Sequence, residues 1–269
     1  MPTITVNGAS LFYRDEGAGD EVVVFSHSYL ASNQHFDAQI EALKDRFRVI
    51  AYDHRGHGQS SVEGPATMEH IYQDGLGLLD ALGITSCHWV GLSTGGFVGM
   101  RLAIREPQRL KSLVLCDTSA DREPLLTRTR HMVSFGILRV LGYKPVMGIV
   151  MRAMFGPSFL ADPDRVAERE LWQKRFESND IPAMIRFGMG IFARKSVYKQ
   201  LSDIELPTLV VVGDEDSATP PAKAQRIASR IKGARLEVIA KAGHLTTVVQ
   251  PELVTKVLTE FLEAAAAPG

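Results

Sequence analysis

The sequence is poor in cysteine, with only Cys87 and Cys116 among 269 residues. Both lie in short apolar runs, where a free cysteine behaves as a small core residue. Two cysteines do not imply the disulfide framework of a small secreted protein, and they cannot supply the four ligands of a structural zinc site. We therefore expect neither feature in this protein.

Net charge and long apolar runs are also lacking. The formal net charge is −1, which favours neither a nucleic-acid nor an anionic membrane partner. No apolar run is long enough to span a bilayer. The segment 1–6 lacks the basic start and apolar middle of a signal peptide, so we expect a cytoplasmic protein. With 45% hydrophobic and 23% charged residues, the chain can form one large domain. Nothing in the sequence indicates an oligomeric state.

Short apolar runs alternate with helical patterns along most of the chain. Continuous apolar strands separated by helices are typical of a parallel sheet covered on both faces. The start of the chain predicts an antiparallel hairpin around Asn7-Gly8. The sequence therefore predicts an α/β fold with a mostly parallel, doubly wound sheet. The other expected strands cover residues 22–25, 48–52, 86–90, 113–116, 208–212 and 236–239.

Residues 120–199 break this alternation. They contain no convincing strand, and methionine, phenylalanine and arginine recur at helical spacing. We interpret them as an inserted helical cap over the carboxyl edge of the sheet, where open α/β sheets bind ligands. The α/β core then comprises residues 1–119 and 200–269. Met132, Phe135 and Phe187 are candidate pocket residues. The cap arginines are expected to be solvated: Arg128, Arg130, Arg139 and Arg152.

The most informative motif is Gly91-Leu92-Ser93-Thr94-Gly95, between a predicted strand and a predicted helix. A serine at such a sharp turn, with glycines two positions before and after it, is a nucleophile elbow. The glycines allow close approach of helix and strand, and the turn pushes the serine hydroxyl clear of the sheet. Ser93 is therefore the candidate nucleophile.

A serine hydroxyl needs an adjacent base, and His244 is the best placed of eight histidines because it follows the last predicted strand. Asp216, after the strand at 208–212, is our choice for the carboxylate that orients the imidazole. Asp214 is expected to brace the turn, and Asp117 is a weaker rival. Six of the other histidines are interpreted as structural or exposed: His54 and His57 in one loop, and His35, His70, His88 and His131 elsewhere.

Acyl transfer also needs donors for the developing oxyanion. We assign one donor to the backbone N–H of Thr94, directly after the nucleophile, and the other to the N–H of Tyr29. Tyr29 lies in the loop Ser26-His27-Ser28-Tyr29-Leu30 after a predicted strand.

Together these features resemble the α/β-hydrolase superfamily, from about Thr3 to Leu262. The resemblance rests on the run Asp53-His54-Arg55-Gly56-His57-Gly58-Gln59-Ser60, on the elbow, and on the acid and base in the chain order serine, aspartate, histidine. The elbow and residues 216–221 are similar to 3-oxoadipate enol-lactonases and related small carboxylesterases. One departure is Ser28, where the family usually has glycine. Its side chain is expected to narrow the pocket or to offer a hydroxyl to the leaving group.

The resemblance implies a cofactor-free serine hydrolase that cleaves a small-molecule carboxylic ester or lactone, with neutral, small to medium esters favoured. The sequence lacks histidine-rich ligand spacing and a G-x-G-x-x-G motif after a strand, so we expect no metal and no dinucleotide. Two enzymatic alternatives use the same triad, namely C–C bond hydrolysis and perhydrolase chemistry. A non-enzymatic ligand receptor on this fold is disfavoured because the chain has a complete candidate triad.

Overall fold

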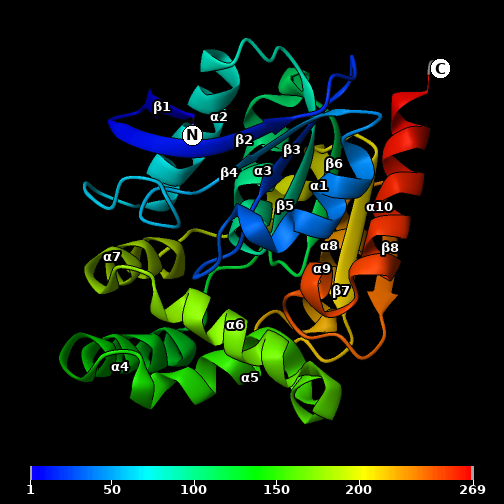
Figure 1. The fold of residues 1–269 in the computed structure, drawn as a ribbon. Coiled ribbons are helices and arrows are strands. Elements are labelled where there is room, and N and C mark those ends of the chain that lie inside the picture. The colour runs from blue at the N-terminus through cyan, green and yellow to red at the C-terminus, as the bar shows by residue number, and fades with distance from the viewer. Residues whose placement is uncertain (1, 268–269) are drawn as a thin grey trace.

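A mixed sheet of eight strands forms the centre of the structure, a computed structural model that describes residues 2–267 (Figure 1). The strand order is β1-β2-β4-β3-β5-β6-β7-β8. Strand β2 pairs antiparallel with β1 and β4, and all the other neighbours are parallel. The predicted fold class is thus confirmed. The strands are β1 (Thr3–Val6), β2 (Ala9–Glu16), β3 (Val22–Ser26), β4 (Arg48–Tyr52), β5 (Cys87–Leu92), β6 (Leu110–Cys116), β7 (Thr208–Gly213) and β8 (Arg235–Ile239).

The predicted hairpin joins β1 to β2. Asn7 and Gly8 both have positive φ, 47° and 72°, and Val6 pairs with Ala9 across the turn. A two-residue turn of this kind follows the right-handed twist of the flanking strands. The hairpin supplies the antiparallel edge of the otherwise parallel sheet.

Helices cover both faces of the sheet. The side chains of Val23 and Phe25 belong to the apolar cluster with α1 and α10, whereas Val24 belongs to the cluster with α2, α3 and α8. Alternation between two buried faces explains why successive residues of β3 are apolar. No helix within residues 2–267 is both long and apolar enough to cross a bilayer. The core helices are α1 (Asp37–Leu43), α2 (Met68–Ala81), α3 (Thr94–Arg105), α8 (Pro221–Arg230), α9 (Thr246–Val249) and α10 (Pro251–Ala266).

Four helices form the predicted insertion between β6 and β7. Figure 1 shows them gathered at one end of the sheet. As the sequence predicts, residues 117–207 contain no strand. The cap residues Met154 and Phe155 share an apolar cluster with Leu245 of the core, so the cap packs on the carboxyl edge. The boundaries at 120 and 199 stay a prediction. The cap helices are α4 (Leu125–Leu141), α5 (Lys144–Ala161), α6 (Val166–Glu177) and α7 (Ile181–Phe192).

Helix α3 lies unusually close to the strands beneath its first turn. A Cβ on Gly91 would collide with the backbone carbonyl of Gly95, and a Cβ on Gly95 would collide with the carbonyl oxygen of Ser26. Neither obstacle is a flexible side-chain end. Only glycine therefore allows this helix to start directly above β3 and β5.

This packing predicts a large difference between two glycine substitutions. Gly91→Ala should lower the free energy of unfolding by about 3 kcal/mol, because the added methyl group overpacks a rigid backbone contact. Gly136→Ala is the control: it lies in α4 with no atom within 4 Å of an added methyl group. It should raise stability by up to about 1 kcal/mol through helix propensity. Urea unfolding measures both changes, and equal effects would contradict the close approach.

Candidate active site

Ser93 lies between the end of β5 and the start of α3, with φ 52° and ψ −104°. A positive φ at a non-glycine residue is a strained conformation that the surroundings must hold. The Ser93 N–H donates to the carbonyl of Cys116 at 2.8 Å, and the hydroxyl of Thr118 donates to the Ser93 carbonyl at 2.7 Å. The end of β6 thus fixes the elbow on both sides of the serine.

Asp216 and His244 come together from two separate loops after β7 and β8. The distance from Nδ1 of His244 to Oδ2 of Asp216 is 2.9 Å. The other carboxylate oxygen accepts the backbone N–H groups of Ala218 and Thr219 at 2.8 and 2.9 Å. The Thr219 hydroxyl donates to Oδ2 at 2.7 Å. Hydrogen bonds from its own loop therefore orient the carboxylate independently of the imidazole.

Both members of this pair are buried, and each changes the pKa of the other. Burial by itself favours neutral His244, but the charge and hydrogen bond of Asp216 outweigh it and raise the histidine pKa above 6.5. Burial by itself raises the pKa of Asp216, but the charge and hydrogen bonds of its partners bring the pKa below 3.8. A charged Asp216 favours the His244 tautomer that carries its proton on Nδ1, in which Nε2 has a free lone pair.

The two rival carboxylates have other partners. Asp117 accepts the Gly213 N–H at 3.0 Å and the Thr246 hydroxyl at 2.5 Å. Burial and the nearby charge of Asp216 raise the Asp117 pKa to about 8. Asp214 accepts the N–H of Ala242 at 3.4 Å and braces the turn after β7. Among these three aspartates, Asp216 is the one that accepts a hydrogen bond from His244 in the part of the chain that the structure describes.

Ser93 and His244 line one cavity of about 310 Å³ between the sheet edge and the cap. Tyr29 and Phe135 line it as well. Much of the remaining wall is apolar, and α4 and α5 contribute Leu138, Val146, Val150 and Met154 to it. This size and apolar character are typical of small-molecule sites.

The sequence matches the alpha/beta hydrolase fold family over residues 21–251. The chain belongs to the α/β-hydrolase family. It is 30% identical to 3-oxoadipate enol-lactonase 2 of Acinetobacter baylyi, with 93% of this chain and 92% of the relative covered. A thermophilic esterase from Thermogutta terrifontis matches the structure with a TM-score of 0.92, 29% identity and coverage of 99% and 100%. The enol-lactonase from Burkholderia xenovorans LB400 matches with a TM-score of 0.89, 30% identity and coverage of 97% and 100%.

Of the predicted pocket residues in this α/β hydrolase, Phe135 lines the cavity and three others do not. Met132 follows the lining residue His131 by one position, and the rotation of about 100° per residue in a helix turns it to the surface. Phe187 is fully buried behind the wall, packed against His57 with ring centroids 4.4 Å apart. The fully buried Ser28 bonds to a neighbouring backbone carbonyl at 3.4 Å. The prediction that Ser28, Met132 and Phe187 line the pocket is therefore wrong.

Sequence reasoning missed a polar part of the cavity wall. Glu123, His131 and Arg194 all line the cavity, although His131 was interpreted as exposed or structural. The His131 ring stacks on Phe192 with centroids 3.8 Å apart. The four cap arginines expected to be solvated are indeed exposed. No motif marks Arg194, because its role depends on a partner 71 residues earlier in the chain.

The loop after β3 that carries Tyr29 is held by two histidines of the 53–60 run. His54 donates its backbone N–H to Nε2 of His27 at 2.8 Å, and Leu30 donates its N–H to Nε2 of His57 at 3.2 Å. The Tyr29 hydroxyl donates to a backbone carbonyl of α7 at 2.8 Å. These bonds fix the loop between the sheet and the cap, as the structural interpretation of His54 and His57 requires.

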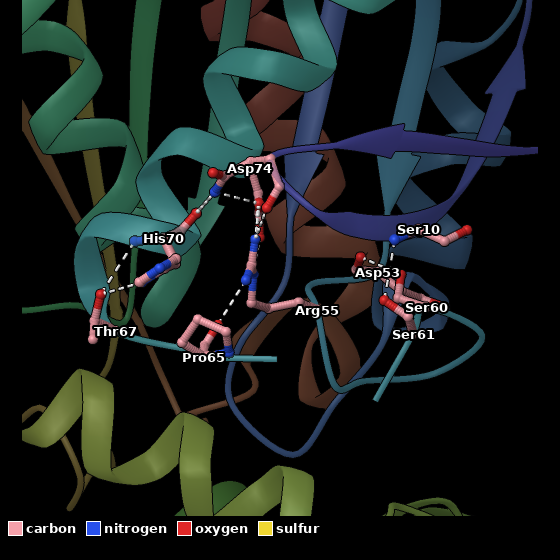
Figure 2. A network of polar contacts seen from close by, with 10 residues as sticks. Ser10, Asp53, Arg55, Ser60, Ser61, Pro65, Thr67, His70 and Asp74 are labelled. Atoms are coloured by element: carbon pink, nitrogen blue, oxygen red, sulfur yellow. Dashed lines mark hydrogen bonds and ion pairs between the residues drawn. The ribbon is translucent and has the colours of Figure 1, made fainter. Parts of the chain in front are cut away.

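The 53–60 run is itself anchored by the polar network in Figure 2. Arg55 forms a buried ion pair with Asp74 of α2, with Nη2 and Oδ1 2.5 Å apart. The Ser61 hydroxyl accepts the backbone N–H of Ser10 in β2 at 3.0 Å. Removing one member of a buried ion pair typically costs about 3–5 kcal/mol. The network therefore fixes the loop that supports Tyr29.

Four histidines near this loop are buried and have lowered pKa values. Burial is the main cause for each, and it lowers the pKa of His27 to about 4 and that of His57 to about 3. The pKa values of His35 and His54 lie well below 6.5, because burial is reinforced by neighbouring histidines. All four side chains are therefore neutral in the folded protein at neutral pH.

Within residues 2–267 no group of three or more His, Cys, Asp or Glu side chains could hold a metal ion.

Neutral buried histidines predict sensitivity to acid. Above pH 6.5 these histidines are neutral in both states, so their contribution to stability is complete. As the pH falls from 6.5 toward 4, the unfolded chain binds protons that the folded chain does not. The free energy of unfolding should then fall by about 1.4 kcal/mol per pH unit for each histidine. Urea unfolding between pH 7 and 5 should show a shallower dependence for His57→Gln, and an unchanged slope would contradict this assignment.

Proposed function

We propose that this α/β hydrolase is a serine hydrolase that cleaves carboxylic esters or lactones through an acyl-enzyme. Ser93 is the nucleophile, His244 the general base and Asp216 the carboxylate that orients it. The observation that carries the proposal is the 2.9 Å contact between His244 and Asp216 beside the cavity that Ser93 also lines. Similarity to an enol-lactonase and an esterase supports the ester or lactone as substrate.

The proposed reaction has two halves. In the first, Oγ of Ser93 attacks the carbonyl carbon while Nε2 of His244 takes the hydroxyl proton. The tetrahedral intermediate then expels the alcohol oxygen, which receives that proton, and an acyl ester remains on Ser93. In the second half, His244 takes a proton from water, and the water oxygen attacks the acyl carbon. The carboxylic acid leaves as Ser93 regains its proton.

The proposed oxyanion donors are the backbone N–H groups of Tyr29 and Thr94. Support comes from a link between the segments that carry them, because the N–H of Gly95 donates to the carbonyl of His27 at 3.2 Å. Preorganised donors of this kind stabilise the charge that develops in the transition state. The start of α3, which favours negative charge, adds to this effect.

The cap is proposed to set the substrate range without supplying catalytic groups. Most of the cavity wall comes from α4, α5 and α7, whereas Ser93 and His244 come from the core. An apolar wall favours acyl chains or rings over charged groups. The core would therefore perform the reaction on whatever ester the cap admits.

Ser93→Ala should abolish hydrolysis of p-nitrophenyl acetate and labelling by a fluorophosphonate probe, because the attacking oxygen is gone. The melting temperature should hardly change. Ser202→Ala, on the exposed surface, is the matched control and should keep both activities. Substantial turnover by purified Ser93→Ala protein would rule out Ser93 as the nucleophile.

The pH dependence tests the base and its carboxylate partner. His244 accepts a proton only when neutral, and its pKa is raised above 6.5. kcat/KM should therefore be low at acidic pH and rise through an apparent pKa above that value. Asp216→Asn should move this limb to lower pH and reduce kcat by about 10⁴-fold, whereas Asp117→Asn should cost far less. Stopped assays across the pH range measure both effects, and a greater loss in Asp117→Asn would show that Asp117, and not Asp216, is the orienting carboxylate.

A further inference from the structure

The cavity beside Ser93 has two chemically different walls. The apolar wall contains Phe135, Leu138, Val146, Val150 and Met154, and the polar wall contains Glu123, Thr127, His131, Ser134 and Arg194. Helix α4 contributes to both, with Thr127, His131 and Ser134 on the polar wall and Phe135 and Leu138 on the apolar wall. From Thr127 to Leu138 the helix advances by about 16 Å. A substrate at Ser93 can therefore meet both walls through different substituents.

Arg194 is the cation of the polar wall. Its side chain is only 5% exposed, and its guanidinium carbon lies 4.0 Å from the ring centroid of Phe97. Nη1 donates to Glu123 and to the Ile191 carbonyl, each at 3.1 Å, while the buried Nε has no hydrogen-bond partner within the described structure. A buried guanidinium at a cavity wall is well suited to bind a carboxylate.

Glu123 changes what this arginine offers to a substrate. Its Oε2 lies 3.1 Å from Nη1 of Arg194. A carboxylate of the protein therefore already accepts a hydrogen bond from the guanidinium. Apart from His244, which is paired with Asp216, only these two of the side chains that line the cavity in residues 2–267 carry a full charge, and their charges cancel. Burial lowers the pKa of His131, which keeps the third titratable group of the polar wall neutral at neutral pH.

We propose that the Glu123–Arg194 pair selects uncharged substrates that carry a hydrogen-bonding group and rejects substrates that carry a free carboxylate. This inference rests on the proposed ester or lactone hydrolysis and specifies its substrate class. One substituent of the scissile carbonyl group packs on the apolar wall. The other ends in a neutral polar group, such as an amide, that reaches the polar wall.

The electrostatics of the pair favour this selection. A neutral amide can donate to Glu123 and accept from Arg194, so neither charged group loses its compensation. A substrate carboxylate would face Glu123 across the same guanidinium, and like charges at short range in a partly buried site repel strongly. An entirely apolar group would bury both charged side chains without replacing their hydrogen bonds to water.

Three methyl esters of equal length test the selection: methyl 5-carbamoylpentanoate, monomethyl adipate and methyl heptanoate. They end in a carboxamide, a carboxylate and a methyl group. The wild-type protein should show a kcat/KM for the carboxamide about 10-fold above that for the carboxylate. Rates are normalised to the sites that a fluorophosphonate probe titrates. p-Nitrophenyl acetate, whose acetyl group has no polar terminus for the Glu123–Arg194 pair to bind, reports the triad separately.

Variants of the two partners should move the carboxylate-to-carboxamide ratio in opposite directions. Glu123→Gln frees Arg194 and should raise the ratio about 10-fold. Arg194→Met leaves Glu123 unpaired and should lower it below the wild-type value. Asp121→Asn is the matched control, because Asp121 lies two positions before Glu123 but pairs with Lys223 at 2.6 Å. The control should keep the wild-type ratio, and circular dichroism verifies that each variant is folded.

The outcomes separate this inference from the function on which it rests. A wild-type protein that neither turns over p-nitrophenyl acetate nor reacts with the probe would overturn the proposed function and the inference with it. Turnover of p-nitrophenyl acetate combined with a wild-type preference for the carboxylate ester would overturn the inference alone. An unchanged ratio in folded Glu123→Gln or Arg194→Met would also overturn it.

Discussion

The close approach of α3 to β3 and β5 is the constraint on which the site depends. Glycines at 91 and 95 remove the Cβ atoms that would separate helix and sheet. The chain can then turn sharply enough at Ser93 to hold a positive φ. The same approach brings the Gly95 N–H to the carbonyl of His27. The turn at Ser93 and the loop that carries Tyr29 are therefore parts of one backbone arrangement.

Buried polar groups hold the loop that carries Tyr29 in place. A loop between sheet and cap must satisfy its backbone groups without bulk water. The neutral ring of His57 accepts the N–H of Leu30 in this loop, and the neutral ring of His27 accepts the N–H of His54 in the supporting run. The Arg55–Asp74 pair ties that run to α2. The run from Asp53 to Ser60 is thus recognisable in the sequence because it builds a scaffold, although it adds no group to the cavity.

The sheet was largely predictable because its signals are local. β4 has the predicted bounds, and the Asn7-Gly8 turn forms where expected. The aspartate that pairs with His244 is harder to identify from the sequence. Asp117 and Asp216 both follow strands that end at the same sheet edge, and sequence spacing alone does not separate them. The turn after β7 aims Asp216 at His244, while Asp117 bonds to Gly213. The role of Asp216 in catalysis stays a prediction.

The sequence by itself determined the fold class and the position along the chain of most strands and of the turn at Ser93, because apolar periodicity and turn chemistry act over a few neighbouring residues. The tertiary structure alone decided the cavity wall. Helical rotation turned Met132 outward, and packing buried Phe187. Glu123 and Arg194 meet only because the cap folds back on itself. Contacts between distant segments depend on how whole helices pack, and no local pattern encodes that.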